Sequence, residues 1–293
     1  MSITASVTGV FIALMRSIKF VPKRIAVFLW AVPFLRMILP FGLNNPYSLM
    51  SLISNFTTKA VTVYHPAKDV VFSMTNCVMA ADEYFPLTYK TNALEMIFSV
   101  ASVIWIIVTA VIFSILTVCY FTAIRDTGNA VRLYGNVYFS KKAEAPAVYG
   151  IVKPKIILPF SCKESNIDLI VLHEKAHIKS GDNLFRILAI ITAALHWFNP
   201  FAWIFLKLFL SDLEMSCDER VVSKLDERRR KEYALTLIEN RQRSTLFSSG
   251  FGGSKLRKRV ENILTFKKLT VFSLISFIAL SAAVFFALLT NAS

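Results

Sequence analysis

The residues His173-Glu174-Lys175-Ala176-His177 combine side chains that could hold and use a metal ion. On a helix, residues four apart lie on the same face, so His173 and His177 can present both imidazoles to one ion. Neutral imidazole is a good zinc ligand, and a catalytic zinc site takes three protein ligands plus a water. Glu174 is rotated by about 100° from His173 and can reach that water without binding the ion. The pattern predicts a zinc site that lowers the pKa of the water, with Glu174 taking its proton. The plain alternative is a pair of histidines on a polar helix face.

A third ligand is available in the stretch from Glu214 to Glu219. Glu214 and Asp218 are four residues apart and therefore share a helical face. In zinc hydrolases of the HExxH-plus-Glu type, a glutamate on a second helix completes the ligand set, and a carboxylate one turn later receives the N–H of a ligand imidazole. We expect Glu214 to bind zinc and Asp218 to orient a histidine, with Asp218 or Glu219 as the alternative third ligand. Cys217 points about 60° away from Glu214 and is less favoured. A charged helix surface would show a similar pattern.

These residues belong to a very apolar chain. Its 293 residues are 55% hydrophobic with a mean hydropathy of +0.54, which indicates a membrane protein. The formal net charge of +14 could suggest nucleic acid. In a membrane protein, however, clustered basic residues more often mark cytoplasmic loops, and the chain has no nucleic-acid motif. We therefore expect contact with the lipid bilayer and no direct binding of nucleic acid.

Candidate membrane helices are the apolar runs at residues 3–18, 25–43, 96–124 and 269–290. The first run is shorter than the about 20 residues that a span needs, and it could instead lie at the membrane interface. Pro33 and Pro40 are expected to kink or end the second run. The fold class is therefore a mainly α-helical membrane protein with about four transmembrane helices: two within residues 1–43, then 96–124, and one at the C-terminal end.

The basic residues predict the orientation. The turn at 19–24 and the segment 125–268 are rich in Lys and Arg, whereas the loop 44–95 is not. By the positive-inside rule, the loop lies outside the cell and segment 125–268 lies in the cytoplasm. We expect a multi-pass protein of the cell membrane with a cytoplasmic α+β domain that carries the zinc site.

Within that domain, residues 129–160 are expected to form short strands, with a hairpin around Lys153-Pro154-Lys155. A strand edge beside a metal can bind extended substrate, although a purely structural hairpin is equally compatible. Residues 184–210 are apolar and are predicted to be two membrane-associated helices with a corner at Pro200. A single crossing there would leave Glu214 and His177 on opposite sides of the bilayer. His196 could stabilise an oxyanion, or it could be an interface histidine.

The motifs in this order resemble those of the BlaR/MecR-type membrane zinc peptidases. They are His173-Glu174-x-x-His177, Trp197-x-Asn199-Pro200 and Glu214-x-x-Cys217-Asp218-Glu219. The pairs Lys153-Pro154 and Leu158-Pro159, and the segment Leu256 to Leu264, also resemble that family, so the similarity runs from about residue 10 to 290. The resemblance implies a gluzincin-like fold with zinc on His173, His177 and Glu214, and Glu174 as the base.

The resemblance also implies a signalling role. Family members relay a signal across the membrane, and their peptidase domain can cut itself and leads to cleavage or release of a DNA-bound repressor. The best known members carry an extracellular penicillin-binding sensor after the last span. This chain ends at Ser293 without one, so sensing of beta-lactams is not expected. We expect a zinc endopeptidase of antirepressor type that cuts a cytoplasmic protein. The sequence leaves open whether the protein forms a homo-oligomer.

Other functions fit the same residues. A housekeeping membrane protease that degrades damaged membrane proteins would use identical zinc chemistry. A non-catalytic signalling protein with a relict site would belong to a different class, and the intact base Glu174 disfavours it.

Overall fold

The computed structural model describes residues 2–16, 22–38, 87–126, 130–143, 145–150, 152–160, 162, 167–241 and 252–266. Its helices are α1 (Ser2–Met15), α2 (Lys23–Leu29), α3 (Ala31–Ile38), α6 (Leu87–Asp126), α7 (Ile167–Ser180), α8 (Asp182–Leu195), α9 (Pro200–Val222), α10 (Glu227–Arg241) and α11 (Gly252–Leu264). Its strands are β1 (Val131–Tyr134), β2 (Val137–Ser140), β3 (Ala147–Tyr149) and β4 (Lys155–Pro159). Most of the predicted outer loop and the apolar run at 269–290 lie outside the described residues.

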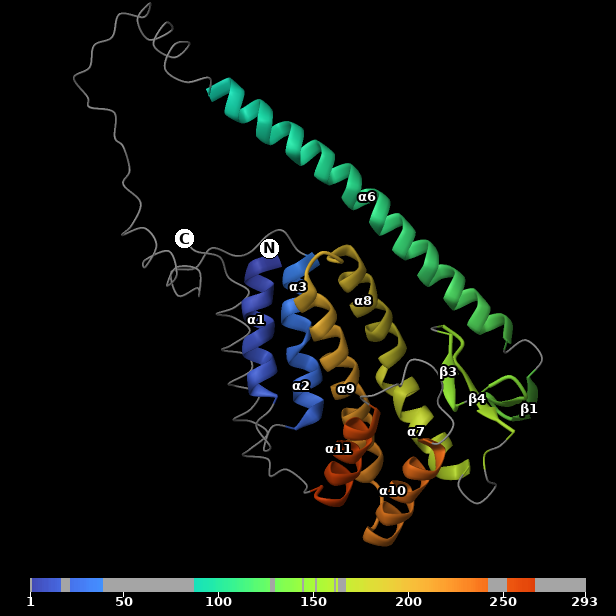
Figure 1. Ribbon diagram of the computed structural model, residues 1–293. Helices are drawn as coiled ribbons and strands as arrows, with labels where there is room; N and C mark the ends of the chain where they lie inside the picture. The colour runs from blue at the N-terminus through green and yellow to red at the C-terminus, as the bar shows by residue number, and fades with distance from the viewer. Residues whose placement is uncertain are drawn as a thin grey trace, which may run out of the picture.

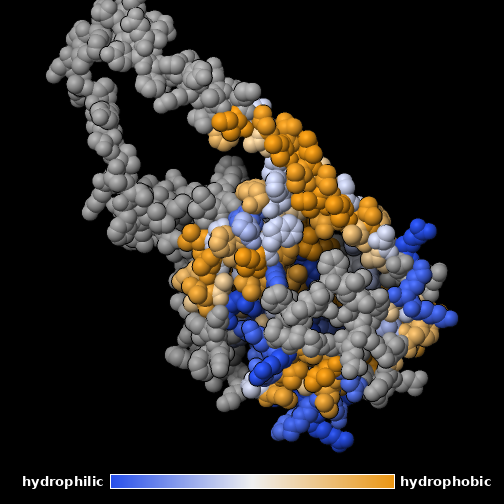
Figure 2. Space-filling view, viewed as in Figure 1, coloured by the Kyte–Doolittle hydropathy of each residue, from blue (hydrophilic) through white to orange (hydrophobic). Residues whose placement is uncertain are grey.

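Helix α6 contains a long apolar segment that could cross a membrane. The segment Ile97–Arg125 has 29 residues, and 6% of its most apolar part is buried. At about 1.5 Å per residue its length exceeds the roughly 30 Å of the hydrocarbon core. In Figure 1, α6 extends obliquely away from the other helices, and Figure 2 shows its visible surface as predominantly hydrophobic. It matches the predicted run at 96–124. Within the described ranges it is the only helix long and apolar enough to span, so the predicted number of four is not established.

Helices α1, α2 and α3 pack as a group against α9 (Figure 1). Their shared core includes Ala5, Ile12, Trp30 and Phe205, all at most 1% exposed. The apolar run at 25–43 is broken into α2 and α3 at Trp30. Pro33 explains the break, because it has no N–H to offer the carbonyl of Leu29, and its ring crowds that carbonyl. The kink predicted at Pro33 is thus present, whereas Pro40 lies outside the described residues.

Helices α8 and α9 form the predicted helical hairpin. Asn199 caps α9, since its side chain accepts a 3.0 Å hydrogen bond from the N–H of Phe201. Pro200 occupies the first turn, where a missing N–H costs nothing. The chain therefore reverses at the predicted corner, and α9 returns Glu214 to the end of α8 that adjoins α7 (Figure 1).

The four-stranded sheet has the order β1-β2-β4-β3. Strands β3 and β4 are antiparallel and form the hairpin predicted from the sequence, while β2 and β4 are parallel. Gly150 adopts φ 90° at the hairpin turn, which favours glycine. Ile156 and Leu158 of β4 pack against Ile170 and Val171 of α7. This contact fixes one side of α7 against the sheet.

The other side of α7 packs into a second core with α9, α10 and α11. Its buried members include Leu169, Val221, Tyr233 and Ile263, one from each helix. In Figure 1 these helices converge below the α8–α9 hairpin. The facing surfaces of these helices also carry polar residues, among them His173 and Asp218.

Candidate metal centre

Helix α7 presents two buried histidines on one face. His173 and His177 are 8% and 6% exposed, and their Nε2 atoms lie 3.1 Å apart. The sheet holds one side of α7 and the helical core holds the other. The predicted helical spacing therefore brings the two imidazoles together, and their surroundings keep them out of bulk water.

Helix α9 brings the carboxylate of Glu214 to the same point. Its Oε2 lies 3.7 Å from Nε2 of His173, and its Oε1 lies 3.7 Å from Nε2 of His177. Two ligands on tetrahedral zinc, with bonds of about 2.0–2.1 Å, lie roughly 3.3–3.5 Å apart. The three donors thus surround a space that suits one zinc ion, and their chemistry fits zinc.

Cys217 offers a competing donor. Its Sγ lies 3.6 Å from Nδ1 of His173 and 3.4 Å from the backbone oxygen of His173. One donor atom each from His173, His177 and Cys217 can be chosen within 4.8 Å of one another. However, Nδ1 of His173 is already 2.7 Å from the hydroxyl of Tyr233, whereas Nε2 faces Glu214. We therefore favour the set of two histidines and Glu214.

A chain of hydrogen bonds orients His173 through its Nδ1 atom. The hydroxyl of Tyr233 lies 2.7 Å from Nδ1 of His173 and donates to Oδ1 of Asp218, also at 2.7 Å. The sequence predicts that Asp218 receives the imidazole N–H itself. Instead Oδ1 of Asp218 is 3.4 Å from Nδ1, and the Tyr233 hydroxyl bridges the two groups. With Nδ1 donating to Tyr233, Nε2 faces Glu214, and its lone pair can bind an ion once Nε2 gives up its proton.

His177 has a separate acidic partner. Oδ2 of the buried Asp182 lies 2.7 Å from Nδ1 of His177. Gly181, between α7 and α8, adopts φ 67°, a conformation that glycine accepts without strain. This turn brings the first residue of α8 back onto the last turn of α7. Each imidazole therefore has an acid-linked partner on Nδ1, and its Nε2 faces the other imidazole and Glu214.

Two arginines contact the remaining sides of Glu214. Nη2 of Arg186 on α8 lies 3.0 Å from Oε1, and Nη1 of Arg259 on α11 lies 3.4 Å from Oε2. Burial raises the pKa of Glu214, but hydrogen bonds from the two imidazoles and the charge of Arg259 bring it well below its usual range. The carboxylate is thus ionised, as a metal ligand must be.

The acidic neighbours have the opposite effect on the histidines. Burial lowers the pKa of His173, but Cys217, Glu214 and Asp218 raise it to about 10. For His177, burial is likewise outweighed, chiefly by the hydrogen bond to Asp182, and its pKa rises to about 12. In the metal-free site the imidazoles therefore hold protons tightly, and a metal ion has to displace them.

The other predicted site residues lie as follows. Glu174 is 8% exposed and lies one residue beyond His173 on α7. Glu219 accepts a hydrogen bond from the N–H of Lys23 rather than facing the histidines. His196 lies at the opposite end of α8, about 20 Å along the helix from Asp182, where its Nε2 is 3.1 Å from the carbonyl oxygen of Met37. The oxyanion role for His196 is therefore wrong, because α8 carries it away from the site.

Main-chain pairing with an extended substrate requires a strand at the edge of the sheet, and β3 is such an edge strand next to α7. Asn183 of α8, however, donates to the carbonyls of Val148 and Gly150, at 3.2 and 3.3 Å. This side chain therefore already occupies part of the outer edge of β3, and the hairpin also has a structural role.

The sequence reasoning missed Asp182, Arg186, Tyr233 and Arg259. Asp182 could have been found from its position five residues after His177, just beyond a glycine. Tyr233 and Arg259 follow Asp218 by 15 and 41 residues, and no spacing rule links them to it. Only the packing of α10 and α11 on α9 brings them to the site.

Comparisons with known proteins identify the family of the chain. The family described as BlaR1 peptidase M56 matches residues 1–263. The chain is 29% identical over 151 residues to the regulatory protein BlaR1 of Bacillus licheniformis, which covers 47% of this chain and 25% of that protein. It is 30% identical over 107 residues to the methicillin resistance mecR1 protein of Staphylococcus aureus, covering 35% of this chain and 18% of that protein. With BlaR1 of Staphylococcus aureus it shares 25% identity over 264 residues, covering 80% of this chain and 44% of that protein. The chain thus spans less than half the length of these curated relatives.

Proposed function

Because the chain belongs to the BlaR1 peptidase M56 family, we propose that it is a membrane-bound zinc endopeptidase that cuts a cytoplasmic protein. The observation that carries this proposal is the meeting of three donors from α7 and α9. The Nε2 atoms of His173 and His177 and the carboxylate of Glu214 lie 3.1 to 3.7 Å apart. Both imidazoles are oriented by acid-linked partners on the opposite nitrogen.

Each group in the site has a defined task in peptide hydrolysis. His173, His177 and Glu214 would hold zinc, which when bound supplies an electrophile for the scissile carbonyl and lowers the pKa of a water. Glu174 takes a proton from that water on its carboxylate and later returns it to the leaving amine. Burial of Glu174 and of both histidines excludes bulk water from these proton transfers.

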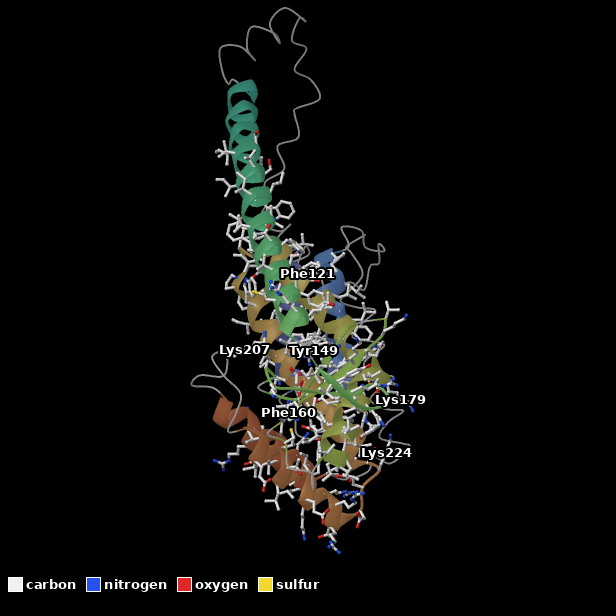
Figure 3. All side chains as sticks on the ribbon, turned by 90° about the vertical axis from the view of Figure 1, so that its right-hand side faces the viewer. Phe121, Tyr149, Phe160, Lys179, Lys207 and Lys224 are labelled. Carbon is white, nitrogen blue, oxygen red and sulfur yellow. The ribbon has the colours of Figure 1, made fainter. Side chains whose placement is uncertain are left out.

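The surface pattern supports attachment to the membrane with the site on the cytoplasmic side. Trp105, within the apolar part of α6, donates a 2.9 Å hydrogen bond to the carbonyl of Leu195 at the end of α8. The adjoining corner exposes large apolar side chains at the level of that segment: Phe198, Phe201, Trp203 and Ile204. Lys179 and Lys224 lie on the opposite part of the body, away from the apolar part of α6 (Figure 3). This distribution fits α8 and α9 dipping into the bilayer with the basic end in the cytoplasm.

A regulatory role is the more specific part of the proposal. The relatives are named as a regulatory protein and a methicillin resistance protein. As the resemblance of its motifs to the BlaR/MecR-type peptidases implies, we propose that the substrate is a transcriptional repressor in the cytoplasm and that the enzyme can also cut itself. Because the chain spans less than half of those relatives, the signal that activates it is not carried over from them.

The test uses the purified full chain in lipid nanodiscs. Glu174→Gln should bind zinc as the unchanged protein does and lose activity by about 10²–10⁴-fold, since it removes only the general base. Glu214→Gln should weaken zinc binding, whereas Cys217→Ser should retain it. Elemental analysis of the purified variants gives their zinc content. Cleavage of cytoplasmic proteins is measured by proteomics, which compares cells that carry the unchanged protein with cells that carry Glu174→Gln.

Two outcomes would contradict this function. Peptidase activity that survives in Glu174→Gln would reject the role of the base. Loss of zinc in Cys217→Ser together with normal zinc in Glu214→Gln would assign the third ligand to Cys217 and reject the proposed ligand set.

A further inference from the structure

Arg259 of α11 reaches the metal centre and makes several contacts there. Nε and Nη2 of Arg259 donate to Oδ2 and Oδ1 of Asp218 at 2.7 and 2.8 Å. Its remaining nitrogen, Nη1, lies 3.4 Å from Oε2 of Glu214. The guanidinium of Arg259 therefore bridges two carboxylates that project from successive turns of α9.

The shape of the arginine side chain suits this bridge. A guanidinium is planar and can form two parallel hydrogen bonds to one carboxylate while a further N–H points elsewhere. Asp218 is 2% exposed, so its ionised carboxylate needs a partner in place of water. Arg259 supplies that partner and at the same time fixes the rotamer of Asp218.

From Asp218 the contact continues to a ligand. The carboxylate accepts from the Tyr233 hydroxyl, whose oxygen lies 2.7 Å from Nδ1 of His173. A change in the Asp218 rotamer would move the Tyr233 hydroxyl, and the His173 ring would lose its orientation. Arg259 thus touches the ligand Glu214 directly and reaches the ligand His173 through two intermediate side chains.

We propose that Arg259 is a positioning residue of the metal centre, and that packing of α11 against α9 completes the zinc site. This inference rests on the proposed function, because it assumes zinc on His173, His177 and Glu214. It predicts that zinc affinity depends on α11, the helix just before the basic residues Lys267 and Lys268 that lead into the apolar run at 269–290.

The competing explanation is that Arg259 only stabilises the fold. Arg259 lies on the same helix as the core residue Ile263, so its loss could loosen α11 without any effect specific to the metal. The experiment therefore needs readouts that a purely structural role would not change. Zinc affinity and the visible spectrum of the cobalt(II)-substituted protein report directly on the ligand geometry.

The experiment compares three variants of the full chain in lipid nanodiscs, titrated with zinc against a chromophoric chelator. Arg259→Gln should weaken zinc binding by about 10–100-fold, the usual cost of losing a group that orients a ligand. Arg259→Lys keeps the charge but not the pair of parallel N–H groups, and should lie between Arg259→Gln and the unchanged protein. The control is Arg257→Gln, two residues earlier on α11. The side chain of Arg257 is 82% exposed, and among the described residues it pairs with Glu261 on its own helix, so this variant should bind zinc normally.

The cobalt spectra and a second position separate the two explanations. The absorption bands should change in Arg259→Gln and stay unchanged in Arg257→Gln. Tyr233→Phe removes the bridging hydroxyl and should also weaken zinc binding. Combined with Arg259→Lys, its effect should be less than additive, because both changes interrupt the same chain of contacts.

The outcomes are distinct. If Arg259→Gln binds zinc as tightly as the unchanged protein with the same cobalt spectrum, the inference is overturned. If Arg259→Gln does not fold, Arg259→Lys and Tyr233→Phe decide, and normal zinc affinity in both would overturn it. Failure of the unchanged protein to bind zinc at all would reject the proposed function instead.

Discussion

At the scale of residues, the two histidines of α7 differ in how they are held. Nδ1 of His177 pairs directly with Asp182, whereas Nδ1 of His173 reaches Asp218 through the hydroxyl of Tyr233. In a zinc site, such contacts fix the tautomer and the ring orientation of the ligand. Because both arrangements use Nδ1, the same face of α7 turns two Nε2 atoms toward Glu214 although the supporting residues differ.

The pKa shifts predict that zinc binding strengthens as the pH rises. The metal-free imidazoles have pKa values raised to about 10 and about 12, so they are protonated near neutral pH and zinc has to displace those protons. Competition titrations should therefore give tighter binding at about pH 8 than at about pH 6, by about tenfold per pH unit for each proton released.

A variant checks the origin of this effect. Asp182→Asn removes the main group that raises the pKa of His177, so it should make zinc affinity less dependent on pH. Calorimetry in buffers of different ionisation enthalpy counts the released protons. Binding that is independent of pH in the unchanged protein would contradict the prediction.

At the scale of elements, α9 is the helix around which the others are arranged. One face carries Glu214 toward α7, and another carries Asp212 toward the N-terminal helices. Asp212 is fully buried, accepts hydrogen bonds from Nε and Nη2 of Arg16, both at 2.7 Å, and accepts one from Trp30 at 2.8 Å. Removing one partner of a buried ion pair is costly, so these contacts fix α9 against α1 and α2.

The crossing of α1 and α9 leads to a prediction about Gly9. A Cβ added there would lie 2.1 Å from Cε2 of Phe205, whose ring is packed against Trp30 and Phe201. In an ordinary helix, Gly→Ala is stabilising by about 1 kcal/mol. Here Gly9→Ala should instead be destabilising by about 1–3 kcal/mol, because the overpacked ring has to move. Thermal unfolding of the purified protein in detergent measures the change.

Two companion variants sharpen the interpretation. Val10→Ala, at an exposed position on α1, should leave the melting temperature nearly unchanged. Phe205→Leu, added to Gly9→Ala, should recover part of the lost stability by making room for the new methyl group. If Gly9→Ala alone raised the melting temperature, the close helix crossing would be contradicted.

At the scale of the whole molecule, one long apolar surface belongs to α6. The surface of α6 is predominantly apolar over the segment Ile97–Arg125, whereas hydrophilic side chains lie at the far end of the body and along its side (Figures 1 and 2). The metal centre lies between these regions, where α7 and the last half of α9 meet. In the orientation proposed above, the site would lie close to the inner membrane surface.

The proposed orientation is tested with cysteine reporters in a Cys77→Ser background. Lys142→Cys, after strand β2, should react with a membrane-impermeant maleimide only when the cytoplasmic face is accessible, as in inverted vesicles. Thr62→Cys, in the predicted outer loop, should react in intact cells. The positive-inside rule gives this expectation, and the reversed labelling pattern would reject the orientation.

The sequence alone determined the parts that depend on local geometry. Helical spacing put His173 and His177 on one face, the apolar run at 96–124 predicted the membrane-length part of α6, and Asn199-Pro200 marked the corner between α8 and α9. Each of these features follows from chain chemistry within a few residues, such as a fixed rotation per residue or a missing N–H.

Only the tertiary structure decided which distant groups meet. Asp182, Tyr233 and Arg259 join the site through a glycine turn and the packing of α10 and α11, and His196 is carried away from it by the length of α8. The physical reason is that side-chain contacts between helices depend on how buried apolar faces fit together. That fit leaves no periodic signal at the polar residues it brings into contact.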